Sequence, residues 1–176
     1  MQAVRYHLAE INIARLRAPL DDPSMADFVA QLDPVNAIAD ESVGFVWRLK
    51  AEGGEASSYV RAFDDERILI NMSVWESVEA LQQYVYRSMH AGVFLDRKKW
   101  FEKLEGPPLA MWWVPAGYTP TIAEGVERLK TLARLGPSRA AFTFKAQFPP
   151  PQKPYEQDEL LRANPTQMTE PCGMDR

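Results

Sequence analysis

The chain has few of the residues on which metal centres and disulfide frameworks depend. Only one cysteine and two histidines occur among its 176 residues. The cysteine, Cys172, cannot form an internal disulfide, which fits a reducing compartment. Two histidines exclude a multi-histidine metal centre within one chain, and neither an HExxH pair nor a GxSxG elbow occurs. These absences predict a protein that does not depend on a metal ion.

The chain also lacks a positive net charge and any long apolar run. Its formal net charge is −4, so no basic field attracts a phosphate backbone and nucleic-acid binding is not expected. No run approaches the roughly 18 apolar residues of a membrane-spanning helix. The start, MQAVRYHLAEI, lacks the apolar core of a signal peptide. We therefore expect a soluble cytoplasmic protein without a membrane partner.

The length suits one domain with a proper core. An apolar share of 46% and a charged share of 25% are ordinary for a globular protein. From Pro149 onward the composition changes to proline, charged and amide residues. The sequence thus predicts one domain over residues 1–148 and a tail over 149–176 that is disordered or wraps around a partner.

Periodicity predicts the secondary structure. Helical spacing follows the capping residues Ser24, Ser77 and Thr121, and a short helical piece is expected over 93–104. Asp33-Pro34 is expected to restart the first helix. Alternation predicts strands at 6–14, 43–49, 59–63, 67–75, 109–114 and 140–148. This order indicates an α+β fold, a ferredoxin-like antiparallel sheet with helices on one face.

Alternation also divides the strand residues between two faces. An apolar set that includes Ile70 and Met72 is expected to pack on the helices. The opposite set mixes polar and aromatic residues, which suits neither a dry core nor a solvated surface. Closing this face against a second copy would form a barrel, so a homodimer is predicted. The set comprises Leu8, Glu10, Asn12, Leu69, Asn71, Ser73 and Trp75.

Five segments resemble an uncharacterised bacterial domain-of-unknown-function family, DUF3291, of the dimeric α/β-barrel superfamily. Together they cover about residues 6–147. The resemblance implies a dimeric α/β barrel. The superfamily includes cofactor-free monooxygenases on polyketide aromatics, ring-isomerising enzymes and haem proteins, and fold similarity does not transfer activity among them. The segments are LAEINIARLRAPLDDPSMADFVAQLDPVNAIADESVGFVWRLK, NMSVWESVEAL, YVYRSMH, KWFE and LAMWWVPAGYTPTIAEGVERL.

Three residues are candidates for catalysis. His90, at the end of a predicted helix, suits a general base or a ligand, and alternatively caps the helix C-terminus. Glu10 is a general base if burial raises its pKa, and alternatively a surface residue. Asn71 suits binding of a phenol or enolate oxygen, and alternatively is a satisfied polar contact.

Further residues are candidates for binding a flat, apolar substrate. Arg97 would pair with a substrate carboxylate, or else is solvated beside two lysines. The tryptophans would wall a cavity, or else are ordinary core residues. Trp112 and Trp113 must point to opposite faces of their strand, so at most one of them faces a cavity. The predicted substrate-binding residues are Asn12, Ser73, Trp47, Trp75, Trp100, Trp113 and Arg97.

Two functions remain open. The first is a small-molecule enzyme without cofactor, a monooxygenase or isomerase that acts on a planar aromatic or polyketide-like substrate. The second is a non-catalytic binding protein for a hydrophobic metabolite or for haem, with His90 as the axial ligand. A dimer with a filled barrel is a third, purely structural possibility.

Overall fold

The structure is a computed structural model that describes residues 4–51, 56–60, 62–90 and 97–152, with only the backbone of Tyr59, Met89, His90 and Arg97. No helix in these ranges is long and apolar enough to cross a membrane. The strands are β1 (Tyr6–Leu16), β2 (Phe45–Arg48), β3 (Ile68–Trp75), β4 (Phe101–Glu102) and β5 (Leu109–Pro115). The helices are α1 (Ala26–Asp40), α2 (Val78–His90), α3 (Arg97–Trp100) and α4 (Ile122–Leu135), with 3-10 turns η1 (Pro23–Met25) and η3 (Ser57–Tyr59).

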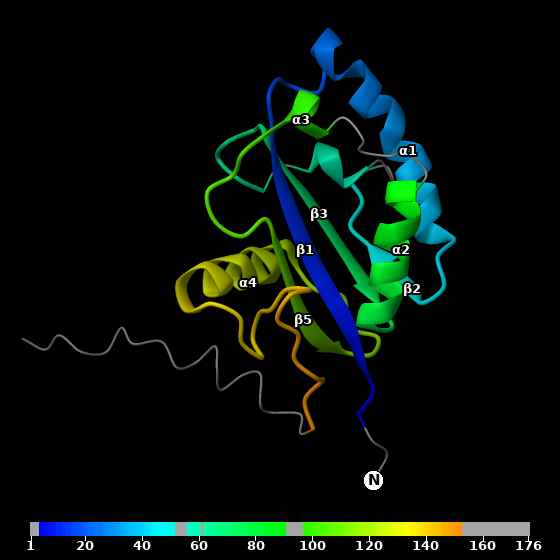
Figure 1. The fold of residues 1–176 in the computed structure, drawn as a ribbon, viewed down its shortest axis with the longest axis vertical. Coiled ribbons are helices and arrows are strands. Elements are labelled where there is room, and N and C mark those ends of the chain that lie inside the picture. The colour runs from blue at the N-terminus through cyan, green and yellow to red at the C-terminus, as the bar shows by residue number, and fades with distance from the viewer. Residues whose placement is uncertain (1–3, 52–55, 61, 91–96, 153–176) are drawn as a thin grey trace, which may run out of the picture.

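The sheet is antiparallel and β1 is its central strand. β1 pairs with β3 on one side and with β5 and β4 on the other, and β2 lies outside β3. The order β5-β1-β3-β2, with α1 after β1 and α2 after β3, is the ferredoxin-like arrangement. The predicted fold class is therefore confirmed (Figure 1).

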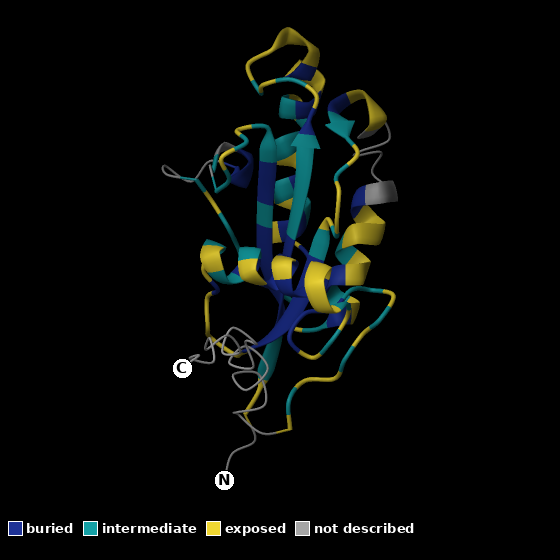
Figure 2. Cartoon of the chain, turned by 90° about the vertical axis from the view of Figure 1, so that its left-hand side faces the viewer, coloured by how far each residue is buried: buried dark blue, intermediate teal, exposed yellow. Residues whose placement is uncertain are grey.

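Helices α1 and α2 contact each other and lie together on one face of the sheet, as predicted (Figure 1). The additional helix α4 packs on the opposite face, across the strands (Figure 2). Its Gly125 allows a close approach, because a Cβ there would lie 2.9 Å from Ile11 Cδ1 and 3.0 Å from Met72 Cε. Both faces are thus covered within one chain.

This arrangement corrects the prediction of which face is open. Alternation does separate Ile11 and Met72 from Glu10 and Asn71. However, the polar face is the one that α1 and α2 cover, and the apolar face lies under α4. Alternation distinguishes two faces without saying which helix covers which. The open face that motivated the homodimer does not occur among the described residues, and the dimer stays a prediction.

Several element boundaries also differ from expectation. Helix α1 runs without a break through Pro34. Of the strand expected over 59–63, the described residues 59, 60, 62 and 63 form no strand, and this part of the chain makes no hairpin with β3. Residues 140–148 make only isolated bridges, the first between Met111 and Phe142, rather than a strand. Within the predicted helix over 93–104, the described part comprises α3 and then β4. Phe142 exchanges two backbone hydrogen bonds with Met111, and the Trp100 carbonyl accepts one from Arg17, long-range pairings that periodicity does not reveal.

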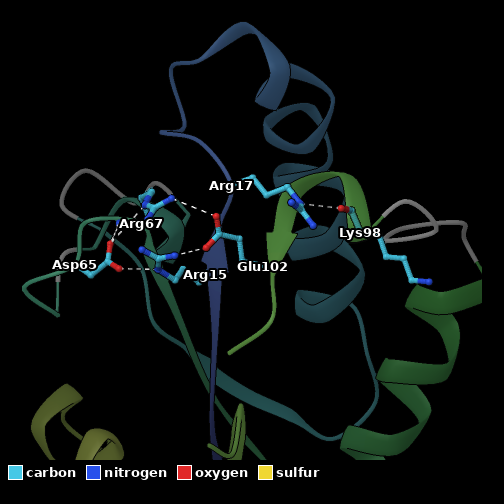
Figure 3. Close-up of polar contacts among 6 residues, drawn as sticks. All are labelled: Arg15, Arg17, Asp65, Arg67, Lys98 and Glu102. Carbon is cyan, nitrogen blue, oxygen red and sulfur yellow. Dashed lines mark hydrogen bonds and ion pairs between the residues drawn. The ribbon is translucent and has the colours of Figure 1, made fainter. Parts of the chain in front are cut away.

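Ion pairs fasten the end of β1 (Figure 3). Arg15 binds Asp65 at 2.7 Å and also pairs with Glu102 of β4. Arg67 Nη1 lies 3.3 Å from Glu102 Oε1, and Arg17 Nε donates to the Lys98 carbonyl at 3.0 Å. These contacts hold α3 and β4 beside β1, and the groups are partly exposed, so their contribution to stability is modest.

Candidate active site

A cavity of about 510 Å³ lies between the polar face of the sheet and helices α1 and α2. Its walls are mostly apolar, and its polar groups gather where β1 and β3 run side by side. This is the usual composition of a small-molecule site. The sheet contributes Glu10, Asn12, Ile13, Leu69 and Asn71; α1 contributes Phe28, Leu32, Val35 and Asn36; and α2 contributes Leu81, Tyr84, Val85 and Ser88.

Glu10 is the central polar residue of the cavity. It is 2% exposed and lies in the middle of β1, opposite Ser73 of β3. The Ser73 hydroxyl donates to Glu10 Oε1 at 2.6 Å, and Trp75 Nε1 donates to Ser73 Oγ at 2.7 Å. Asn12 Nδ2 donates to Glu10 Oε2 at 3.0 Å. Ser73 and Asn12 therefore hold the carboxyl group in one orientation.

The environment of Glu10 favours a readily exchanged proton. Burial raises the pKa of Glu10 from 4.5 to about 7, against the opposing effect of the hydrogen bonds from Ser73 and Asn12. Desolvation disfavours the charged carboxylate, and these donors stabilise it. A carboxyl group with a pKa near neutrality can both accept and return a proton.

Asn12 and Asn71 form a cross-strand pair beside Glu10. Asn12 turns its amide nitrogen toward the carboxylate. Asn71 Oδ1 accepts a hydrogen bond from the Ser57 hydroxyl at 3.0 Å. The contact with the carboxylate assigns the amide orientation of Asn12 and leaves its acceptor oxygen for another partner; with Oδ1 of Asn71 bound to Ser57, its amide hydrogens face other partners. The pair therefore offers a ligand one acceptor and one donor side by side.

Tyr84 forms the wall of the cavity on the α2 side. Its ring stacks on Trp75, with centroids 5.0 Å apart and an interplanar angle of 24°. Burial raises the pKa of the Tyr84 hydroxyl above 10.0, a hydrogen bond with Ser88 opposes this rise, and the charge of Glu10 adds to it. Tyr84 thus stays protonated at neutral pH and is a hydrogen-bond donor.

An ion pair lies near Tyr84 at the end of α1. Arg48 Nε donates to Asp40 Oδ1 at 2.8 Å and Nη2 donates to Oδ2 at 3.1 Å, a bidentate pair. The positive charge of Arg48 lowers the pKa of Tyr84 and the negative charge of Asp40 raises it. The two charges therefore act on the tyrosine hydroxyl in opposite directions.

The structure brings five of the predicted site residues together. Glu10, Asn12 and Asn71 line the cavity. Ser73 and Trp75 lie behind Glu10 and reach the cavity only through their hydrogen bonds to each other and to its carboxylate. Strand alternation alone placed all five on one face, as the register of β1 and β3 confirms.

The other predicted tryptophans lie elsewhere. Trp47 packs on the apolar face that α4 covers, and Trp112 belongs to the same cluster. Trp113 packs on the opposite face and donates to the Phe148 carbonyl at 2.7 Å, so these neighbours do point to opposite faces. Trp100 packs with Phe28. None of these four side chains lines the cavity, whose aromatic walls are Phe28, Tyr84, Phe101 and Phe144.

His90 and Arg97 cannot be placed in the site. His90 ends α2 and Arg97 begins α3, and both side chains lie outside the described residues. Their predicted roles remain predictions. The described part of the chain holds no group of three or more histidine, cysteine, aspartate or glutamate residues that could bind a metal ion.

The contribution of the helices and of η3 to the cavity was not predicted from the sequence. Tyr84 follows the buried Leu81 by three residues, a spacing that puts both on one helix face. That signal was available, but it does not separate a cavity wall from a packed core. Ser57 gave no signal, because its role depends on the fold of residues 56–60 against β3.

A model of the domain-of-unknown-function family DUF3291 matches residues 7–158. The chain belongs to DUF3291. None of the curated proteins matches it.

Several solved structures resemble this DUF3291 protein at low sequence identity. SnoaB, a cofactor-independent oxygenase from Streptomyces nogalater, is 13% identical, with a TM-score of 0.42 over 64% of this chain and 95% of that chain. NE2512 from Nitrosomonas europaea, a protein of unknown function, is 13% identical, with a TM-score of 0.40 over 66% and 95%. PA3566 from Pseudomonas aeruginosa is 10% identical, with a TM-score of 0.41 over 67% and 98%. At these TM-scores the similarities do not bear on the activity of this chain.

Proposed function

We propose that this DUF3291 protein is an enzyme that binds a small, planar, mainly apolar molecule in the cavity and removes a proton from it with Glu10. One observation carries the proposal: a buried carboxyl group whose pKa lies at about 7 borders a cavity of about 510 Å³. Burial alone would raise the pKa of a structural carboxyl group in a filled core as well, so the adjoining cavity is what distinguishes Glu10 from such a group.

The surrounding residues support this role for Glu10. Ser73 donates to Oε1 at 2.6 Å and Asn12 donates to Oε2 at 3.0 Å, so each oxygen of the carboxylate keeps a lone pair that can accept a proton. Phe28 and Phe101 meet edge to face and, with Leu32 and Val35, form apolar walls. Such walls suit flat rings and exclude water, which strengthens the electrostatic interactions inside.

The proposed reaction begins with proton transfer. A C–H or O–H bond of the substrate breaks, its proton forms an O–H bond on Glu10, and the electron pair stays on the substrate. In an isomerisation, Glu10 returns the proton to another carbon. In an oxygenation, the anion reduces O₂ to a peroxide that takes up the proton, and loss of water from the peroxide leaves a carbonyl group.

Anthrone, a fused-ring compound with an acidic methylene group, is a suitable first probe. We expect the wild-type protein to accelerate its aerobic conversion to anthraquinone, followed by absorbance and by an oxygen electrode. Glu10→Gln should lose about 10²–10⁴-fold of this acceleration, the usual contribution of a general base. The control is Glu41→Gln, at an exposed residue that follows α1.

Two results would contradict the proposal. Equal rates for the wild type and Glu10→Gln would remove Glu10 as the base. Tight binding of anthrone with no acceleration in either protein would instead favour the second candidate, a binding protein for a hydrophobic metabolite. The haem version of that candidate depends on His90, and the cavity residues that the structure describes include no histidine. A homodimer and a cytoplasmic location remain part of the proposal.

A further inference from the structure

The cavity has polar groups on two opposite walls. A substrate that loses a hydroxyl proton would not require both. Glu10 lies on the sheet wall and Tyr84 on the helix wall. A phenol that loses its own hydroxyl proton needs a single base near that oxygen. A ketone that loses a proton from carbon develops its negative charge on an oxygen two bonds away, so it needs a base and a separate donor.

The contacts fix Tyr84 and Glu10 at the same end of the cavity. The Tyr84 ring stacks on Trp75, the Trp75 indole donates to Ser73, and Ser73 donates to Glu10. Trp75 is fully buried and Ser73 is 6% exposed, so neither can move freely. Side chains that cannot move freely therefore connect Tyr84 to Glu10, which favours a substrate held between the two walls.

We propose that the protein catalyses the enolisation of a planar ketone, in which Glu10 removes the proton next to the carbonyl group and Tyr84 donates a hydrogen bond to the enolate oxygen. This inference rests on the proposed function and names its substrate class and a second catalytic residue. The C–H bond breaks, its proton moves to Glu10, and the electron pair moves to the carbonyl oxygen. Return of the proton to carbon completes the cycle without an oxidant.

The charges around the Tyr84 hydroxyl are compatible with this role. The titratable and charged groups that act on it are Glu10, Arg48 and Asp40. Burial keeps the phenol protonated, and a neutral donor is what an enolate oxygen requires.

Proton exchange on 2-tetralone tests the inference. This bicyclic ketone exchanges the C–H bonds next to its carbonyl group with D₂O, and NMR under anaerobic conditions follows the exchange without oxygenation. We expect acceleration by the wild-type protein and its loss in Glu10→Gln. Tyr84→Phe, which keeps the ring against Trp75, should slow exchange about 10²-fold with little change in the Kd for 2-tetralone. Tyr86→Phe, at a residue of α2 that is 63% exposed, should match the wild type.

Each other outcome overturns a defined part of the argument. Exchange by Tyr84→Phe at the wild-type rate would remove Tyr84 as the donor and leave Glu10 intact. A loss of binding in Tyr84→Phe equal to its loss of exchange would make Tyr84 a packing residue. Exchange by Glu10→Gln at the wild-type rate would overturn the proposed function itself. A wild-type protein that does not accelerate exchange would overturn ketone enolisation, while the anthrone assay still tests Glu10 separately.

Discussion

The two faces of the sheet are covered by helices in different ways: one face is packed without space, and the other encloses a cavity. On the α4 face, side chains such as Met72 and Trp112 fill the interior completely, and the close approach at Gly125 leaves no room. On the α1 and α2 face, the cavity separates the helices from Glu10 and Asn71. The same strands therefore build a packed core with one set of alternating residues and a site with the other.

In this small domain, buried polar strand residues occur on the face that borders the cavity. The buried residues of the α4 face that come from the strands are apolar, so that face stabilises the fold by burial. The opposite face has two apolar clusters, which contain Trp75 and Phe28 respectively, with Glu10 between them at the cavity. A buried carboxyl group costs stability there, a usual property of functional sites.

The largest expected effect comes from truncating the filled face. Met72→Ala should lower the free energy of unfolding by about 2–5 kcal/mol, because the side chain is fully buried against Gly125 and no solvent or neighbour fills the gap. Urea unfolding measures this loss. A loss below about 1 kcal/mol would mean that the α4 face is not close-packed.

Lowering the pH should raise the free energy of unfolding, because Glu10 becomes protonated. Unfolded Glu10 titrates near 4.5 and folded Glu10 near 7, so the folded chain binds the extra proton between these pH values. The contribution of this raised pKa is fully favourable below pH 4.5 and is lost as the pH rises through 7, by about 3 kcal/mol in total.

This coupling between the protonation of Glu10 and stability is tested by measuring the free energy of unfolding of the wild type and of Glu10→Gln at pH 5 and at pH 8. The wild type should lose more stability than the variant between the two pH values, because glutamine does not titrate. Parallel pH profiles for the two proteins would show that Glu10 is not buried as described.

A substitution at Asn71, next to Met72, tests whether the cavity face tolerates changes that the filled face does not. Asn71→Leu should change the free energy of unfolding by no more than about 1 kcal/mol, since it removes the hydrogen bond from Ser57 and adds apolar surface to a cavity. It should nevertheless weaken the binding of 2-tetralone. Urea unfolding and a binding titration separate these effects, and a cost similar to that of Met72→Ala would remove the contrast between the faces.

Ser73→Ala should raise the pKa of Glu10 above 7, because the hydroxyl donates to the carboxylate and lowers that pKa. Carbon NMR titration of the glutamate side chains measures the shift, with Ser24→Ala, at an exposed residue before α1, as the matched control. An unchanged pKa would mean that Ser73 does not hold the carboxylate.

The smallest effect is expected at the end of β1. Arg67→Ala removes the pair with Glu102 but leaves Arg15 in place, and both partners are about one third exposed. The Tm should fall by no more than about 2–4 °C, and by less in high salt. Thermal unfolding at two salt concentrations measures the difference, and a larger fall would show that these ion pairs contribute more to stability than exposed pairs usually do.

The sequence by itself determined the elements that depend on short-range patterns. Alternation predicted β1 and β3 and put Glu10, Asn12 and Asn71 on one face. The capping box at Thr121 and Glu124 predicted the start of α4, where Glu124 N donates to Thr121 Oγ1 at 3.2 Å. Such patterns reflect hydrogen bonds and side-chain directions within a few residues, which each residue type largely fixes.

Only the tertiary structure decided how those faces are used. The predicted open face became the cavity face because α1 and α2 cover it, and the tryptophans proposed as its walls are replaced by Phe28, Tyr84 and Phe101. The raised pKa of Glu10 likewise depends on burial by residues far apart in the chain. Which helix packs on which face, and how closely, is a balance of many long-range contacts, and no local pattern in the sequence encodes that balance.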